Sequence, residues 1–163
     1  MTRSIRELSI DLGAALSARG WTAATAESCT GGLVAGAITD IAGSSGWFDR
    51  GFVTYSNEAK VELLGVRAET LARHGAVSEA TAREMVAGAL ERSLASIAVA
   101  VTGIAGPGGG TADKPVGLVW FAWGVRGGGV DAISHRFPGD RSAVRDASVG
   151  VALAGLLGRA GPR

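Results

Sequence analysis

Polar residues that could do chemistry gather first in the segment Ala26 to Gly32, AESCTGG. This segment lies where a predicted strand ends and a predicted helix begins, and in α/β sheets the carboxyl ends of strands are the usual place for a site. Backbone N–H groups at the start of a helix have no partners within it, so they favour an anion or an oxyanion. Ser28 and Thr30 could equally act only as helix caps, because both residue types are preferred there. The segment alone leaves both interpretations open.

A lysine in an unusual position is the second feature, in the segment Thr54 to Lys60, TYSNEAK. Lysine is scarce in this chain, which has only Lys60 and Lys114 against fourteen arginines. The sequence predicts that Lys60 falls in the first turn of a helix, where the positive end of the helix dipole disfavours a cation and lowers the pKa of an amine. The alternative is a solvated surface lysine on an amphipathic helix.

A glycine-rich stretch, VTGIAGPGGG over residues 101–110, is the third feature. It lacks the Gly-Lys-Ser/Thr of a Walker P-loop, and it lacks the spacing and the following helix of a dinucleotide-binding fold. Its glycines could still expose N–H groups to a phosphate or an oxyanion. The alternative is a mobile surface loop.

Other common chemistries find little support in this sequence. The chain has one cysteine, Cys29, and two distant histidines, which give no ligand spacing for zinc and no disulfide within the chain. Neither histidine lies in the three segments, and a G-x-S-x-G elbow is absent, so a Ser-His-Asp triad is not expected. His74 is predicted to end a short helix and His135 to lie on a strand face.

Composition places the chain among compact globular proteins. It has 163 residues, of which 47% are hydrophobic and 19% charged, enough for one domain over 1–163 that needs no disulfide or metal. A formal net charge of +1 argues against a nucleic-acid partner. No apolar stretch approaches the ~18 residues of a membrane span. The N-terminus does not read as a signal peptide, so we expect a cytoplasmic location and no membrane partner.

Hydrophobic periodicity and turn residues predict the secondary structure. Ser4 is the predicted N-cap and Gly20 the predicted stop of the helix over 4–19. Asn57 and Gly65 have the same roles in the helix over 57–65. Helices are predicted over 4–19, 30–41, 57–65, 67–74, 78–93 and 141–157. Strands are predicted over 22–27, 51–55, 96–104, 116–125 and 129–137.

The order of these elements predicts the fold class. Strands alternate with helices early in the chain, the run over 96–104 is apolar enough for a central strand, and the last two strands form an antiparallel hairpin. We therefore predict an α/β fold, a three-layer α/β/α sandwich with a mixed β-sheet.

At the three segments the sequence resembles the CinA C-terminal domain family, whose members include nicotinamide-nucleotide amidases. The resemblance covers nearly the whole chain and is carried by four blocks, at 25–60, 74–82, 99–117 and 137–145. It implies the same three-layer fold, no metal, no cofactor and frequent homodimers. An additional N-terminal domain found in many members is not expected here, so the chain resembles the stand-alone form.

The resemblance also implies an activity and a set of site residues. The reaction would convert nicotinamide mononucleotide to nicotinic acid mononucleotide and ammonia, with Ser28 as nucleophile and Lys60 as general base. A lysine acts as a base only when neutral, so its pKa must fall from the ordinary value of about 10.4. Tyr55 and Thr102 would orient the amide or the lysine. The residues expected to bind substrate are Cys29, Thr30, Gly31, Gly32, Asn57, Gly103, Gly106 and Arg141.

Two roles within that set are more specific. Backbone N–H groups of Cys29 and Thr30, or of Gly103, would hold the oxyanion. Arg141 would bind the phosphate, because arginine binds phosphate bidentately, and Arg145 would do the same or face solvent.

Two rival functions stay open. One is a non-catalytic nucleotide-binding regulatory protein linked to competence or DNA damage, as the historical family name suggests. The other is an amidase that acts on a different pyridine or ureido substrate.

Overall fold

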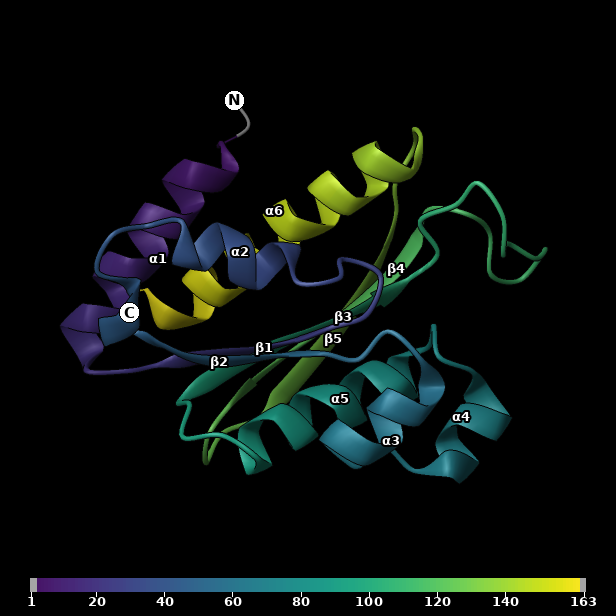
Figure 1. The fold of residues 1–163 in the computed structure, drawn as a ribbon, viewed down its shortest axis with the longest axis horizontal. Coiled ribbons are helices and arrows are strands. Elements are labelled where there is room, and N and C mark those ends of the chain that lie inside the picture. The colour runs from purple at the N-terminus through teal and green to yellow at the C-terminus, as the bar shows by residue number, and fades with distance from the viewer. Residues whose placement is uncertain (1–2, 162–163) are drawn as a thin grey trace.

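A five-stranded mixed sheet forms the centre of the computed structural model, which describes residues 3–161 (Figure 1). The strand order is β2-β1-β3-β4-β5, with β1 parallel to β2 and β3, and with β4 antiparallel to β3 and β5. The strands are β1 (Ala23–Glu27), β2 (Phe48–Val53), β3 (Ile97–Gly103), β4 (Leu118–Val125) and β5 (Val130–Arg136).

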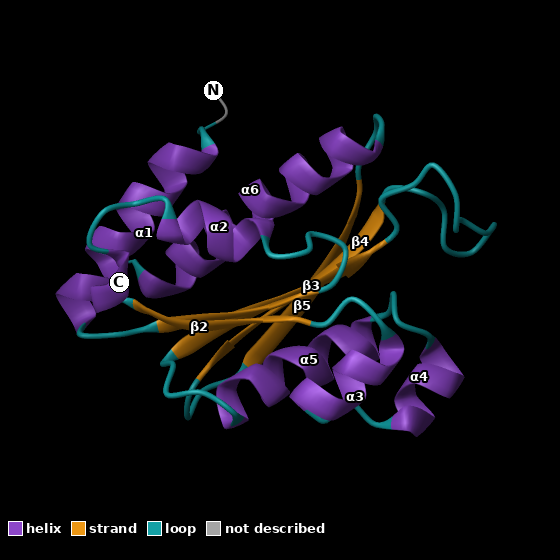
Figure 2. Cartoon of the chain, in the orientation of Figure 1, coloured by secondary structure: helices purple, strands orange, loops and turns teal. Residues whose placement is uncertain are grey.

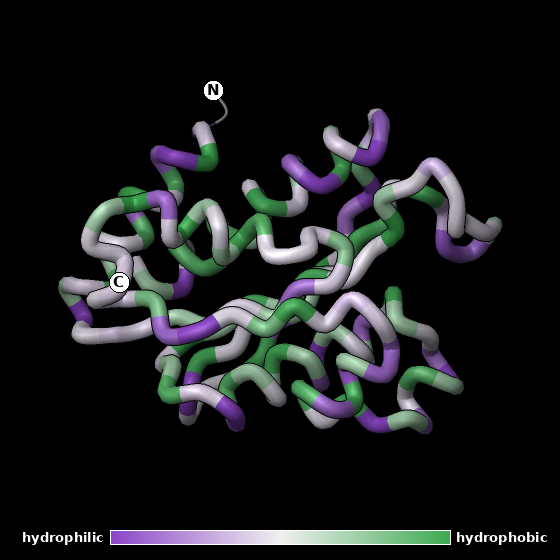
Figure 3. Tube along the Cα trace, in the orientation of Figure 1, coloured by the Kyte–Doolittle hydropathy of each residue, from purple (hydrophilic) through white to green (hydrophobic). Residues whose placement is uncertain are grey.

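Helices cover both faces of the sheet, as predicted (Figure 2). One layer holds α1 (Ile5–Arg19), α2 (Leu33–Thr39) and α6 (Arg141–Ala160). The other holds α3 (Asn57–Leu64), α4 (Ala68–His74) and α5 (Glu79–Glu91). Hydrophobic segments are frequent along the central strands, while hydrophilic segments recur along the helices of both layers (Figure 3). The three-layer α/β/α architecture is confirmed.

The two faces of the sheet differ in side-chain size. The face under α1 and α6 buries large side chains, among them Leu12, Phe121 and Trp123. The face under α5 buries mainly alanines, listed here in sheet order: Ala24, Ala26, Ala98, Ala100 and Ala122. Small residues on this face let α5 lie close to the sheet. Helix α3 packs beside α5 and contacts β2.

The parallel strands bring three segments to one edge of the sheet. Glu27 pairs in register with Val53 on one side and with Val101 on the other. The residues that follow β1, β2 and β3 therefore emerge side by side at the carboxyl ends of the strands, where α/β folds place their sites.

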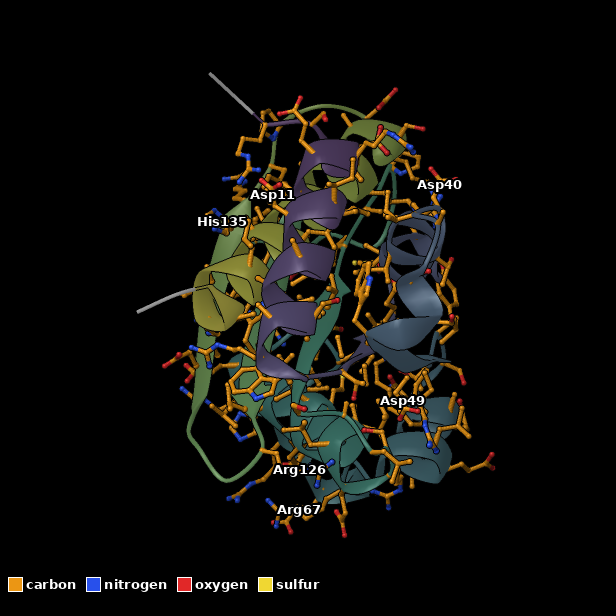
Figure 4. All side chains as sticks on the ribbon, turned by 90° about the vertical axis from the view of Figure 1, so that its left-hand side faces the viewer. Asp11, Asp40, Asp49, Arg67, Arg126 and His135 are labelled. Carbon is orange, nitrogen blue, oxygen red and sulfur yellow. The ribbon has the colours of Figure 1, made fainter. Side chains whose placement is uncertain are left out.

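Several sequence predictions are confirmed in detail. Ser4 caps α1 through a hydrogen bond from the Glu7 N–H, and Gly20 ends the helix with a left-handed φ of 67°. The β4–β5 hairpin is antiparallel. His74 ends α4, and His135 lies exposed on β5 at the surface, as Figure 4 shows together with charged side chains such as Arg126.

Several predicted boundaries were wrong, among them the end of the last helix, which runs to Ala160 and not to residue 157. The second helix begins at Leu33 and not at residue 30, because Gly31 and Gly32 have φ values of 58° and 103° and turn the chain first. The second strand begins at Phe48 instead of residue 51. Ser56 caps α3 and Asn57 is its first residue, since the Ser56 hydroxyl accepts the Ala59 N–H.

No helix within residues 3–161 combines the length and the apolar character needed to cross a membrane.

Candidate active site

A cavity of about 300 Å³ opens at the edge of the sheet where β1, β2 and β3 end. Ser28 follows β1 directly, Tyr55 and Lys60 come from the connection after β2 and from α3, and the loop from Ile104 to Gly109 follows β3. Two further wall residues, Ala76 and Val77, precede α5. Segments distant in the sequence thus share one cavity.

Within the cavity the hydroxyl of Ser28 lies beside the amine of Lys60. The Nζ atom of Lys60 lies 3.0 Å from the Oγ atom of Ser28. That separation falls within the range of roughly 2.6–3.2 Å over which a base takes a proton from its partner. The pair has the geometry of an activated nucleophile.

The surroundings of Lys60 favour its neutral form. The side chain is 1% exposed, and no ion pair within the described residues includes it. Burial lowers the pKa of Lys60, because the ammonium loses hydration that no carboxylate replaces. The expected alternative of a solvated surface lysine is wrong.

Backbone carbonyls fix the position of the amine. Nζ lies 2.9 Å from the carbonyl oxygen of Thr54, 3.3 Å from that of Tyr55 and 3.5 Å from that of Ser56. A neutral amine has two N–H donors and one lone pair. It can therefore donate to the two nearer carbonyls and accept the hydroxyl proton of Ser28 with its lone pair.

Glu27 is a residue that the sequence reasoning missed. Its carboxylate is fully buried and accepts hydrogen bonds from the Thr30 hydroxyl at 2.6 Å and from the N–H groups of Val34 and Ala35 at 2.9 and 3.0 Å. The signal available in the sequence was an acidic residue at the end of an otherwise uncharged strand.

The contacts of Glu27 correct two expectations about the helix start. The first N–H groups of α2 are already bonded, so they are not free for an oxyanion. Helix capping by Ser28 is also wrong, since the N-cap of α2 is Gly32 and no side chain caps it. Ser28 faces Lys60 instead.

The turn after β1 places Ser28 and orients the next peptide group. The Ser28 N–H donates to the Val101 carbonyl, and the Ser28 carbonyl accepts the Gly31 N–H at 3.0 Å. The N–H of Cys29, which lines the cavity, makes no hydrogen bond to another described residue. Thr30 is fully buried, so its N–H is out of reach of a ligand.

Most of the expected site residues line the cavity: Ser28, Cys29, Tyr55, Asn57, Lys60, Thr102, Gly103, Gly106 and Arg141. Three expected binding residues, Thr30, Gly31 and Gly32, do not. They form the turn behind the nucleophile, where left-handed φ values require glycine at the last two positions.

The side chains of Tyr55 and Thr102, which were expected to orient the amide or the lysine, bond to other groups. The Thr102 hydroxyl donates to the Ala76 carbonyl at 2.8 Å, which holds the wall before α5 against the end of β3. Tyr55 holds Lys60 with its backbone carbonyl, while its exposed phenol oxygen accepts a hydrogen bond from Arg141 at 3.2 Å. Arg141 also donates to the Gly106 carbonyl at 2.8 Å.

Cys29, beside the nucleophile, is poorly suited to attack. The side chain is buried, and burial raises the pKa of its thiol to about 11. A thiol with this pKa remains protonated near neutral pH, and the thiolate is the nucleophilic form.

Arg145 is partly exposed and does not line the cavity. Its half-buried side chain donates from Nε to the Cys29 carbonyl at 3.1 Å and from Nη2 to the Thr30 carbonyl at 3.4 Å.

Within residues 3–161 no group of three or more His, Cys, Asp or Glu side chains is arranged to hold a metal ion.

Comparisons with known proteins agree on one family. The sequence model described as "CinA C-terminal domain" matches residues 5–159. The chain is 59% identical over 143 residues to a nicotinamide-nucleotide amidohydrolase PncC of Enterobacter agglomerans, covering 88% of this chain and 87% of that protein. It is 58% identical over 151 residues to the protein of the same name in Escherichia coli K12, covering 91% and 90% of the two chains.

A solved structure shares the fold closely. The crystal structure of competence/damage inducible protein CihA from Agrobacterium tumefaciens superimposes with a TM-score of 0.93 at 52% identity, covering 97% of this chain and 98% of that one.

Proposed function

The chain belongs to the CinA C-terminal domain family, and from this premise we propose that it is an amidohydrolase that converts nicotinamide mononucleotide to nicotinic acid mononucleotide and ammonia. The observation that carries the proposal is the 3.0 Å contact between Ser28 Oγ and a buried Lys60 Nζ inside a cavity. A purely regulatory nucleotide-binding protein has no need of a hydroxyl beside a buried amine whose pKa burial lowers. The amidase is therefore favoured over that rival.

The first half of the reaction acylates the enzyme. Lys60 takes the hydroxyl proton as Ser28 Oγ forms a bond to the carboxamide carbon of the pyridine ring. The Cys29 N–H, together with Gly103 across the cavity, holds the oxyanion of the tetrahedral intermediate. When the C–N bond breaks, the Lys60 ammonium returns the proton to the leaving nitrogen, which departs as ammonia.

The second half restores the serine. Water loses a proton to Lys60 and attacks the ester carbon, and the bond to Ser28 Oγ breaks. Lys60 then protonates Oγ, and the product leaves as a carboxylate. Through both halves the Thr54 and Tyr55 carbonyls hold the amine in reach of Ser28.

Recognition of the phosphate would come from the mouth of the cavity. Arg141 lies there, held between the Gly106 carbonyl and the Tyr55 phenol. Its remaining N–H donors can bind a phosphate, since a guanidinium presents five donors in a fixed fork. Asn57, at the first turn of α3, supplies a further polar group to the cavity.

A substrate panel tests the proposed function. The wild-type protein is given nicotinamide mononucleotide, nicotinamide riboside, nicotinamide and a ureido compound, and ammonia release is followed. We expect kcat/KM for the mononucleotide to exceed that for the riboside by roughly 10- to 100-fold, because a hydrogen bond to a charged group contributes about 1.5–3 kcal/mol. Nucleotide binding with no ammonia from any compound would favour the regulatory function. Equal rates on the riboside would favour a different substrate.

Three further expectations remain proposals. We infer that the protein is a homodimer, as the family resemblance implies, with one domain per chain over 1–163 and a cytoplasmic location. Light scattering should then give twice the 16.4 kDa of a single chain. A mass of one chain across the working concentration range would contradict the dimer, and recovery outside the cytoplasmic fraction would contradict the location.

A further inference from the structure

We propose that Arg145 is a positioning residue for the nucleophile, which acts by clamping the backbone of the turn that carries Ser28. The inference rests on the proposed function, because it assigns a part in that reaction to a side chain that does not line the cavity. Its Nε and Nη2 atoms hold the carbonyls of Cys29 and Thr30, the two central residues of the turn from Ser28 to Gly31.

The turn is fastened on one side by the sheet. The Ser28 N–H bonds to the Val101 carbonyl of β3, which continues the parallel ladder by one residue. Beyond Ser28 the chain leaves the sheet, so this pairing ends there. The clamp by Arg145 fastens the next two peptide groups at the point where the ladder stops.

The Arg145 clamp fixes the peptide groups of the turn next to the reacting atoms. The Cys29 carbonyl belongs to the peptide group that follows the Cys29 α-carbon, so holding it limits rotation of Cys29 about ψ. The preceding peptide group, which carries the Cys29 N–H, is held by the bond from the Gly31 N–H to the Ser28 carbonyl. Together the two contacts keep the Cys29 N–H and Ser28 Oγ in fixed relation, which an oxyanion donor requires.

The guanidinium of Arg145 lies against the turn at Gly31. A β-carbon added at Gly31 would come within 3.3 Å of Arg145 Nη2, and Gly31 has a φ of 58°. No carboxylate within the described residues forms an ion pair with Arg145. Carbonyl oxygens of the nucleophile turn are thus its bonded acceptors in the structure.

One helix carries two arginines with different tasks. Arg141 and Arg145 are four residues apart on α6, so they project from the same side of the helix. Arg141 reaches the cavity mouth and Arg145 reaches the turn behind Ser28. Their substitutions should therefore change different kinetic constants.

The test compares Arg145→Met with Arg141→Met and with a surface control, Arg6→Met. The exposed Arg6 side chain pairs with Asp40 at the end of α2. We expect Arg145→Met to lower kcat by about 10- to 100-fold with KM within about threefold of wild type, since a small misplacement of reacting groups has a cost of this size. Arg141→Met should mainly raise KM, and Arg6→Met should leave both constants unchanged. Arg145→Lys, which keeps the charge but not the fork, should recover only part of kcat.

A second readout separates positioning from folding and from the choice of substrate. The rate at which a fluorophosphonate labels Ser28 should fall in Arg145→Met, at a temperature where circular dichroism shows the variant folded. An unchanged labelling rate, or an unchanged kcat, would overturn the role of Arg145. If the wild type released no ammonia from nicotinamide mononucleotide, the proposed function would fail, and the labelling rates would still decide on Arg145.

Discussion

Ser28→Ala is expected to reduce ammonia release from nicotinamide mononucleotide by at least about 10³-fold, because the variant has no atom that can form the acyl-enzyme. The side chain is small and 8% exposed, and its Oγ bonds to Lys60 and the Tyr55 carbonyl without supporting the core. The fold should therefore survive the substitution. Steady-state ammonia release, with circular dichroism as the check on folding, measures the effect.

Cys29→Ala is the matched control for the nucleophile, since it removes the neighbouring sulfur and leaves the hydroxyl. The buried thiol, with its pKa raised to about 11, has no part in the reaction, so kcat should stay within a few-fold of wild type. A heavy loss in Cys29→Ala together with near-normal activity in Ser28→Ala would show a thiol enzyme and overturn the assignment.

Lys60→Met should lower kcat by a similar factor, roughly 10³-fold, because it keeps the volume of the buried chain and removes the only amine in reach of Ser28 among the described residues. The double variant with Ser28→Ala should be no worse than either single one, since groups that act as a unit are not additive. A double variant far worse than both would mean that the two residues work independently.

The same substitution should remove a pH dependence of thermal stability. Burial lowers the pKa of Lys60 in the folded protein below its ordinary value of 10.5, so the unfolded chain binds more protons between these two values. The contribution of Lys60 to stability therefore increases as pH rises through that window. Lys60→Met removes this dependence, and it also leaves the Thr54 and Tyr55 carbonyls without the amine donor. Melting temperatures of both proteins across pH 6 to 10 would measure the difference, and parallel pH profiles would contradict it.

The pH dependence of activity follows from the same shift. Lys60 must be neutral to accept the proton, so kcat/KM should rise with pH until Lys60 in the free enzyme is deprotonated, at a pH below 10.5. A profile that falls with rising pH over this limb would exclude an amine as the base.

Local sequence patterns are enough to predict the helices and strands and the three segments that hold the candidate site residues. Alternating strands and helices, with caps such as Ser4 and Gly20, give the layered fold, because periodicity and turn residues act over short distances. The scarcity of lysine drew notice to Lys60, and the family resemblance paired it with Ser28.

Tertiary structure decided the rest, because strand order and burial depend on contacts between segments distant in the chain. The order β2-β1-β3 brings the ends of three strands together, which places Lys60 Nζ beside Ser28 and out of water. It also lets Glu27 accept hydrogen bonds from the Val34 and Ala35 N–H groups at the start of α2, so these two groups are not free for an oxyanion. The packing of α6 brings Arg145 to the turn that carries Ser28. No local sequence pattern predicts this contact, because it joins residues more than 100 positions apart.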